Sequence, residues 1–280
     1  MEFEILSNWY RRADVKFELI KQLYKREFAL LVPSWIKDAD IKKRSTRMLK
    51  VHNVGHLDFV LKALEFHEKK TPYNFYYSLA QYYDGIPNQD LNFTRRKENG
   101  INEDWKYRHE TEMKGFDFLL DIDAGGHEDI LFAYESAKLI KQFYDNNDCP
   151  YILRFSGKGF HFVIPYHYLP QFSLEGFQDK TQYMYYSMIA KRLYEKFSEL
   201  IDLSIYDSRR VCKLSYSIAN YEDNSYVAYP FGTNKEFEDF RLRDFEVSNF
   251  DKPIYRRGEH VFNMSMSPQK MLKKLEVEHG

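Results

Sequence analysis

The order of hydrophobic segments between residues 116 and 165 is the feature that most constrains the fold. The apolar run FDFLLDID has strand composition and is followed by a Gly-Gly turn. ILFAYESAKLIKQFYDNN, from residue 130, then has the apolar spacing of an amphipathic helix. YILRF and FHFVIP follow with only the turn SGKG between them, which predicts a β-hairpin. A strand, a helix and a hairpin in this order indicate an α/β or α+β protein.

The flanking sequence predicts helices on both sides of this unit. Residues 1–70 read as a helical N-terminal part, because apolar residues in VKFELIKQLYKREFALL and HLDFVLKALEFHEKK recur about every 3.6 residues. Residues 71–78 and the segment SYVAYPF have strand composition. Amphipathic helices are expected at 181–201 and, behind a Ser cap and a Pro, at 267–278. The polar stretch 85–114 reads as a long loop.

Composition bounds the possible function classes. Hydrophobic residues make up 44% of the 280-residue chain, which excludes a disordered chain. The formal net charge is -1, so any nucleic-acid footprint must be a local basic patch. Cys149 and Cys212 are too far apart for a CxxC zinc site or a disulfide framework, which fits a cytoplasmic protein. We expect neither a signal peptide nor a membrane span, because no apolar run is long enough for either.

Two carboxylates stand two residues apart at the end of the first strand. With this spacing Asp121 and Asp123 project from the same face, while Ile122 points into the core. Adjacent carboxylates repel unless a cation lies between them, and such oxygen ligands suit Mg²⁺ or Mn²⁺. The alternative is a pair of solvated Asp residues, since a bare DxD is common by chance. Asp117 lies further back, and we expect it to be solvated or salt-bridged rather than a ligand.

The turn SGKGFH, between the two hairpin strands, has the residue types that bind polyphosphate. Gly157 and Gly159 allow a tight turn that exposes backbone N–H groups. Ser156 offers a hydroxyl, Lys158 a charge and His161 a further donor. An ordinary Gly-containing hairpin with a surface lysine is the alternative. The segment is not a Walker A loop, because no Ser or Thr follows the lysine.

A third polar segment, DLSIYDSRRVCKLS, follows the 181–201 helix. Asp202 precedes a basic cluster of Arg209, Arg210 and Lys213. A further carboxylate followed by cations suits a two-metal site with charge nearby for a triphosphate. Asp207 competes with Asp202 for the ligand role, and a solvated basic turn is the alternative for the whole segment.

The order of these three segments resembles the archaeo-eukaryotic primase superfamily. LLDID is similar to its first motif, SGKGFH to its second and IDLSIYDSRRVCKLS to its third. The resemblance covers about residues 70 to 231. KREFALL and NFYYSLAQYYD, upstream, resemble segments that precede the first motif in archaeal primase small subunits. The resemblance implies a twisted, RRM-like β-sheet flanked by helices, within one domain over 1–280, with a catalytic core at 71–250 and a tail with a helix at 251–280.

The resemblance also implies template-dependent nucleotidyl transfer by a DNA primase or primase-polymerase. Asp121, Asp123 and Asp202 would hold two divalent ions, Mg²⁺ or Mn²⁺, and do the catalysis. The incoming nucleoside triphosphate would be bound by the second motif and the basic cluster, through Ser156, Gly157, Lys158, Gly159, His161, Arg209, Arg210 and Lys213. Tyr76 or Tyr77 would contact the sugar, with a core position as the alternative for both.

Expected partners are nucleoside triphosphates and a single-stranded or primed DNA template, with nucleoid-associated activity in the cytoplasm. Candidate strand contacts are Arg95, Arg96, Lys97, Arg256 and Arg257, for which a plain surface role is the alternative. The zinc-binding Cys and His cluster usual in replicative small subunits is absent, so no zinc is expected. A subunit that docks on a primase large subunit and a stand-alone enzyme of a mobile element, virus or CRISPR system both remain open.

Four other functions are compatible with parts of this pattern. A metal-dependent nuclease needs the carboxylates but not the SGKGFH turn. A DxD glycosyltransferase does not require the segment that contains Asp202. A repair-type polymerase of the same superfamily would extend primers without starting them, and a degenerate relative would bind nucleic acid without catalysis. The sequence leaves the choice between NTP and dNTP open.

Overall fold

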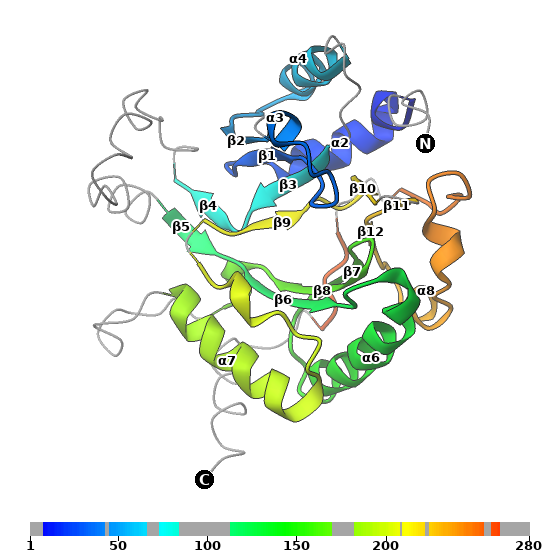
Figure 1. The fold of residues 1–280 in the computed structure, drawn as a ribbon. Coiled ribbons are helices and arrows are strands. Elements are labelled where there is room, and N and C mark those ends of the chain that lie inside the picture. The colour runs from blue at the N-terminus through cyan, green and yellow to red at the C-terminus, as the bar shows by residue number, and fades with distance from the viewer. Residues whose placement is uncertain are drawn as a thin grey trace.

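Two four-stranded antiparallel sheets lie one above the other and carry most of the fold (Figure 1). The structure is a computed structural model that describes residues 8–42, 45–65, 73–83, 113–169, 182–207, 209–221, 224–254 and 259–263. The mixed α+β architecture is the fold class predicted from the sequence. The upper sheet has the order β2 (Thr46–Leu49), β1 (Phe28–Leu31), β3 (Asn74–Ser78), β9 (Val211–Lys213). The lower sheet has the order β12 (Tyr229–Pro230), β7 (Ile152–Phe155), β8 (Gly159–Ile164), β6 (Phe118–Asp123).

The lower sheet is built from the predicted strand, helix and hairpin. β6 leads into α6 (Ile130–Asn146), and the hairpin β7–β8 then returns beside β6. After α7 (Gln182–Phe197), Ile201 forms an antiparallel bridge to Ile122 on the free side of β6. The chain thus runs β–α–β–β–α followed by a short pairing segment, the connectivity of RRM-like sheets.

The helix expected over 181–201 ends four residues early, at Phe197. The reason is that the following residues pair with β6 instead of continuing the helix. The N–H of Asp123 donates to the carbonyl of Leu200 at 2.9 Å, and the N–H of Asp202 donates to the carbonyl of Asp121 at 2.8 Å. Three residues of backbone pairing therefore bring the third motif against the first.

The N-terminal part is helical only in part, so the expectation was wrong for the residues that form β1 and β2. It contains α2 (Ala13–Gln22), α3 (Ala39–Lys42) and α4 (Val54–Glu65), but also β1 and β2. Lys25 has a φ of 56°, which interrupts the helical path before β1. The apolar run FALL then pairs with β2 on one side and β3 on the other. A short apolar run of this kind fits a helix and a buried strand equally well by periodicity.

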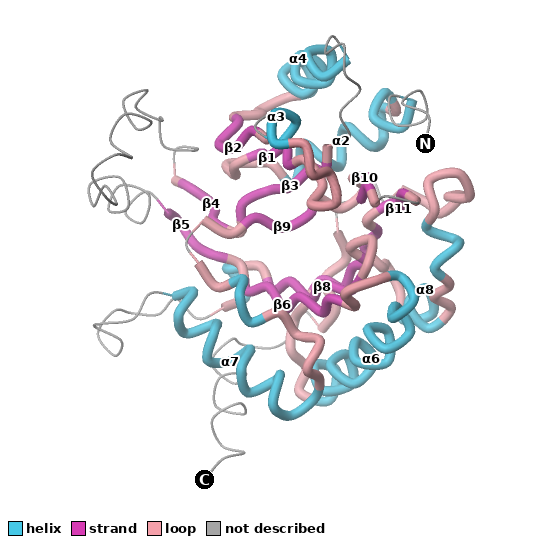
Figure 2. The backbone as a smooth tube through the Cα atoms, viewed as in Figure 1, coloured by secondary structure: helices cyan, strands magenta, loops and turns pink. Residues whose placement is uncertain are grey.

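Helices cover the outer faces of the two sheets, and Figure 2 shows the strands between them. α6 packs against β6 and β8, α7 packs against β6, and α2 and α4 pack against each other above the upper sheet (Figure 1). Two small sheets complete the strands: β4 (Ala80–Tyr82) with β5 (Met113–Phe116), and β10 (Ile218–Asn220) with β11 (Ser225–Val227). The shorter helices are η3 (His127–Asp129), η4 (Tyr166–Tyr168), η6 (Leu203–Ile205), α8 (Asn234–Glu238) and η7 (Leu242–Phe245).

An aromatic cluster packs behind the β7–β8 turn. Phe155 and Phe160 meet across the hairpin with ring centroids 5.9 Å apart, and both contact Phe240, at 5.3 and 5.0 Å. Such edge and offset ring contacts add to the burial of apolar area. The turn that carries the second motif is therefore supported by a packed core on its far side.

Several expectations lie outside the described residues. These are the 85–114 loop up to residue 112 with its basic cluster Arg95, Arg96 and Lys97, the pair Arg256 and Arg257, and the 267–278 helix. Among the helices that the structure does describe, none combines the length and apolar character needed to cross a membrane.

Candidate active site

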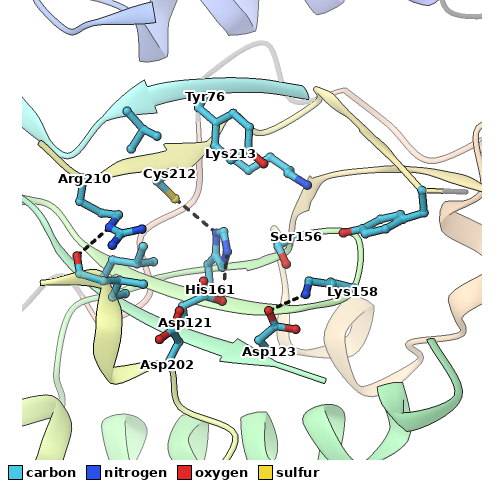
Figure 3. Close-up of a pocket in the computed structure, with 14 residues that line it drawn as sticks. Tyr76, Asp121, Asp123, Ser156, Lys158, His161, Asp202, Arg210, Cys212 and Lys213 are labelled. Atoms are coloured by element: carbon cyan, nitrogen blue, oxygen red, sulfur yellow. Dashed lines mark hydrogen bonds and ion pairs between the residues drawn. The ribbon is translucent and has the colours of Figure 1, made fainter. Parts of the chain in front are cut away.

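A cavity of about 200 Å³ lies between the two sheets and brings the three motifs together (Figure 3). β6, the β7–β8 turn and the segment after α7 line it from the lower side, and β3 and β9 from the upper side. The lining side chains are Tyr76, Leu119, Asp121, Asp123, Ser156, Lys158, His161, Asp202, Ile205, Arg210, Val211, Cys212, Lys213 and Tyr221.

All three predicted carboxylates line this cavity. Asp121 and Asp123 project from one face of β6, and Ile122 between them is completely buried, as the alternation predicts. Asp202 reaches the same cavity because its backbone pairs with Asp121. The three acidic groups thus come from two segments that are held together by backbone hydrogen bonds.

Each carboxylate already has a partner. Asp123 forms an ion pair with the ammonium of Lys158, at 2.6 Å, and Asp121 lies 3.4 Å from Nε2 of His161. Asp202 accepts a hydrogen bond from the N–H of Ser204, at 2.8 Å, and so caps η6. In the part of the chain that the structure describes, no three His, Cys, Asp or Glu side chains are grouped closely enough to hold a metal ion. The cavity nevertheless offers carboxylate oxygens, the type of ligand that Mg²⁺ and Mn²⁺ prefer.

Asp117 is salt-bridged, as expected, but buried rather than solvated. Its carboxylate lies 2.8 Å from Arg26 and accepts a hydrogen bond from the N–H of Tyr166, at 2.9 Å. These contacts lie outside the residues that line the cavity. Asp117 therefore fixes the start of β6 rather than contributing a ligand.

The two glycines of the turn are there because a side chain would not fit. Gly157 has a φ of +111°, and a Cβ there would lie 2.4 Å from the Cβ of Ala219. A Cβ on Gly159 would lie 1.9 Å from the carbonyl oxygen of Ile122, where β8 pairs with β6. The close approach of the turn to β6 is what brings Lys158 to Asp123. The N–H of Ser156 closes the turn on the carbonyl of Gly159, at 2.9 Å.

His161 connects the lower sheet to β9. Its Nδ1 lies 3.3 Å from the sulfur of Cys212, and its Nε2 faces Asp121. Burial disfavours the imidazolium, but Cys212 and the Asp121 carboxylate outweigh that effect and raise the pKa of His161 to about 9. The imidazole is therefore charged at neutral pH, and the cavity gains a cation above its carboxylates.

Lys213 reaches the cavity from β9 between two aromatic rings. Its ammonium lies 5.6 Å from the ring centroid of Tyr76 and 5.5 Å from that of Tyr221. Burial lowers the pKa of Lys213 to about 8, in spite of the nearby Asp121. Lys213 thus stays mainly charged at neutral pH, although little water surrounds it.

The two adjacent arginines of the third motif have different positions. Arg210 lines the cavity, and its guanidinium donates to the carbonyls of Ile205 and Ser204 and pairs with Asp207 at 3.0 Å. Asp207 thus holds Arg210 and is not among the carboxylates that line the cavity. Arg209, predicted to bind nucleotide, does not line the cavity. Burial and the neighbouring Arg47 lower the pKa of Arg209.

Of the two candidate sugar contacts, only Tyr76 lines the cavity. Tyr77 is buried, and its hydroxyl accepts a hydrogen bond from Arg154 at 3.0 Å, so Tyr77 occupies the core position that the sequence left open as the alternative to a sugar contact. Adjacent residues of a strand point to opposite faces, which separates the two tyrosines.

Sequence reasoning missed several lining residues. Tyr221 has no motif spacing to mark it, and it reaches the cavity only because β10 ends beside the turn. Cys212 was considered only for a zinc site or a disulfide framework, although its place within the basic cluster puts it on β9 beside Lys213. Leu119, Ile205 and Val211 are apolar and carry no chemical signal.

A buried ion pair supports β9 from behind. Arg154 is fully buried on β7, next to His161 across the hairpin. It lies 3.1 Å from the carboxylate of Glu259 and donates to the carbonyl of Lys213 at 2.8 Å. A carboxylate from the segment 259–263 thus pairs with the arginine that donates a hydrogen bond to the backbone of Lys213.

The similarities between this chain and known proteins lie among solved structures. No protein-family model and no curated protein matches the sequence. Among solved structures, the chain is similar to the crystal structure of primase RepB', with a TM-score of 0.41 and 8% sequence identity. The match covers 94% of this chain and 64% of that one, so the chain spans less than two thirds of the length of RepB'. A TM-score this low supports no inference about function, and the proposal below rests on the residues of this chain.

Proposed function

We propose that the chain is a nucleotidyltransferase of the primase-polymerase kind, which adds nucleotides to a primer or starts one on a DNA template. One observation carries the proposal: a single cavity joins the carboxylates of the first and third motifs to the hydroxyl and cations of the second motif and β9. These groups come from widely separated segments of the sequence. Carboxylates beside a cationic pocket are what the transfer of a nucleoside monophosphate from a triphosphate needs.

The charges of the cavity suggest how the nucleotide would lie. Lys158 and Lys213 are seen towards one end of the cavity and Arg210 towards the other (Figure 3). The guanidinium of Arg210 is already engaged by two carbonyls and by Asp207, and the cavity residues next to it are the apolar Ile205 and Val211. We therefore place the triphosphate at the lysine end and the nucleoside at the Arg210 end, which differs from the sequence-based expectation for Arg210.

Asp121, Asp123 and Asp202 are the proposed ligands of two divalent ions, Mg²⁺ or Mn²⁺. When bound, such ions supply Lewis-acid activation of the attacking hydroxyl and offset charge on the phosphates. Lys158 would then be free to leave Asp123 for a phosphate oxygen. Ser156 would donate a hydrogen bond to the same phosphates, and the positive charge of His161 would attract them, because both residues line the cavity with Lys158. Tyr76 would pack on the sugar.

A metal-dependent nuclease is the main competing function, since it also uses clustered carboxylates. It does not require the four donors opposite them, Ser156, Lys158, His161 and Lys213, all of which line the cavity. This cationic side favours a triphosphate substrate over the hydrolysis of a diester.

The test is a primer-extension and de novo synthesis assay with Mg²⁺ or Mn²⁺, and with dNTPs and NTPs in separate reactions. We expect incorporation by the wild type and a loss of about 10³-fold or more in the variant Asp121→Ala/Asp123→Ala, because essential electrostatic groups are removed. Asp251→Ala removes an exposed carboxylate that does not line the cavity and is the matched control, with wild-type activity expected.

Two results would contradict the proposal. A folded wild type that neither binds nucleotide nor extends a primer with any metal would rule out nucleotidyl transfer. Degradation of the primer, abolished by the same Asp variants, would assign the cavity to a nuclease instead.

A further inference from the structure

Lys213 differs from every other cation of the cavity in having no acceptor. Its side chain is 6% exposed and lies between two tyrosine rings. In the described structure no carboxylate forms an ion pair with its ammonium, and no oxygen accepts a hydrogen bond from it. Lys158, in contrast, is paired with Asp123, and Arg210 is paired with Asp207. A buried ammonium without a protein acceptor is costly for a folded protein, so its acceptors must come from what fills the cavity, water or a bound ligand.

The groups that face Lys213 define what this ligand must be. Asp121 and Asp123 lie across the cavity on β6, and Lys158 lies on the turn. Cys212 precedes Lys213 on β9, and Tyr76 and Tyr221 flank its ammonium. The tyrosine faces attract the cation weakly but accept no proton from it. An anion that enters the cavity meets an ammonium that no protein carboxylate of the described residues pairs with, and under the proposed function this anion is the triphosphate.

We propose that Lys213 is the general acid that protonates the departing pyrophosphate, an inference that rests on the proposed nucleotidyl transfer. The 3′-hydroxyl oxygen forms a bond to the α-phosphorus, and the bond from that phosphorus to the oxygen bridging to the β-phosphorus breaks. The proton of the hydroxyl leaves to solvent. The ammonium of Lys213 passes a proton to the pyrophosphate oxygen and becomes a neutral amine, which water protonates again after the pyrophosphate leaves.

The surroundings of Lys213 suit it to proton donation better than those of Lys158. A general acid works best when its pKa lies near the working pH. Burial lowers the pKa of Lys213 to about 8, and neighbouring Lys158 acts in the same direction. Lys158, in contrast, is about one third exposed and ion-paired with Asp123. The two lysines therefore have different roles. Lys158 binds the negative charge of the phosphates, and Lys213 both binds this charge and transfers a proton.

The experiment compares Lys213→Arg with the wild type in steady-state nucleotide incorporation across pH 6 to 10. Arginine keeps the positive charge but does not release its proton in this range. We expect KM for the nucleotide to stay within a few-fold and kcat to fall by about 10²-fold or more. In the wild type kcat/KM should decline above pH about 8. This decline and the solvent deuterium isotope effect on kcat should both be lost in the variant.

Two further variants keep the result specific. Lys158→Arg, in the same cavity, should retain the decline of kcat/KM above pH 8, and Lys191→Arg, exposed on α7, should behave as the wild type. If Lys213→Arg keeps the wild-type kcat and isotope effect, Lys213 only binds charge and the inference is overturned, while nucleotidyl transfer stands. If the wild type incorporates no nucleotide, the proposed function itself fails.

Discussion

Replacing Glu259 by Gln tests whether the buried ion pair behind β9 holds the fold together. Arg154 is fully buried, and Glu259 is its only carboxylate partner among the described residues. The substitution keeps the shape of the side chain and removes its charge. The guanidinium is then left in the core without a counterion, which disfavours the folded state.

The size of the effect follows from the contacts that Arg154 keeps. Removing one partner of a buried pair costs about 3–5 kcal/mol. The carbonyl of Lys213 and the hydroxyl of Tyr77 still accept hydrogen bonds from Arg154, and the carboxylate of Glu259 is 13% exposed. We therefore expect the free energy of unfolding to fall by the lower end of this range, about 3 kcal/mol. With about 2–4 °C per kcal/mol for chains of this size, the melting temperature should fall by about 6–12 °C.

Urea unfolding followed by circular dichroism measures this loss, and the double variant Arg154→Met/Glu259→Gln is the control. Removing both charges leaves neither one buried alone, so much of the stability should return. A loss below about 1 kcal/mol for Glu259→Gln would refute the reasoning, because the hydrogen bonds of Arg154 would then suffice without a counterion. Equal losses in the single and double variants would contradict it as well.

Two further predictions concern the turn and β9. In Gly159→Ala the new Cβ would meet the carbonyl of Ile122 at 1.9 Å, so the end of the β6–β8 pairing must open. We expect a lower melting temperature in thermal unfolding and a loss of nucleotide binding in calorimetric titration. Nucleotide binding as tight as that of the wild type would contradict the predicted clash. Lys213 has a folded-state pKa of about 8, against 10.5 for a free lysine. The unfolded chain binds the proton more tightly between these values, so the stability of the wild type relative to Lys213→Met should rise by about 3 kcal/mol from pH 8 to 10.5, as measured by urea unfolding. A difference that does not change with pH would show that Lys213 is well solvated.

The lower sheet could be predicted because its residues carry local signals. The SGKG turn between two apolar runs specifies a hairpin, and the alternation around Ile122 fixes which carboxylates face the cavity. The placement of Asp202 beside Asp121 was inferred from the order of the motifs. The physical cause of this placement is the backbone hydrogen bonding of residues 200–202 to β6, which no local sequence pattern predicts.

The parts of the fold and of the site that the sequence did not predict depend on contacts between distant segments. β1 looked helical because a short apolar run has no distinguishing period, and only pairing with β2 and β3 makes it a strand. Arg209 and Arg210 are neighbours with identical chemistry, and only the carbonyls of η6 select Arg210 for the cavity. Tyr221 and Glu259 reach the site only through tertiary contacts, so the sequence around them contains no motif that predicts their positions.

The segment 259–263 also bears on how the protein is made. Tyr151 and Phe262 exchange backbone hydrogen bonds, and Glu259 reaches Arg154 from 105 residues further along the chain. During synthesis the guanidinium of Arg154 leaves the ribosome long before its counterion does, and until then it is better solvated by water than buried. The hairpin can form early, but the space between the sheets closes around Arg154 only when residue 263 has emerged. A ribosome-bound chain that stops short of this segment should therefore lack an ordered nucleotide cavity, so that activity begins only after residues 259–263 have been translated.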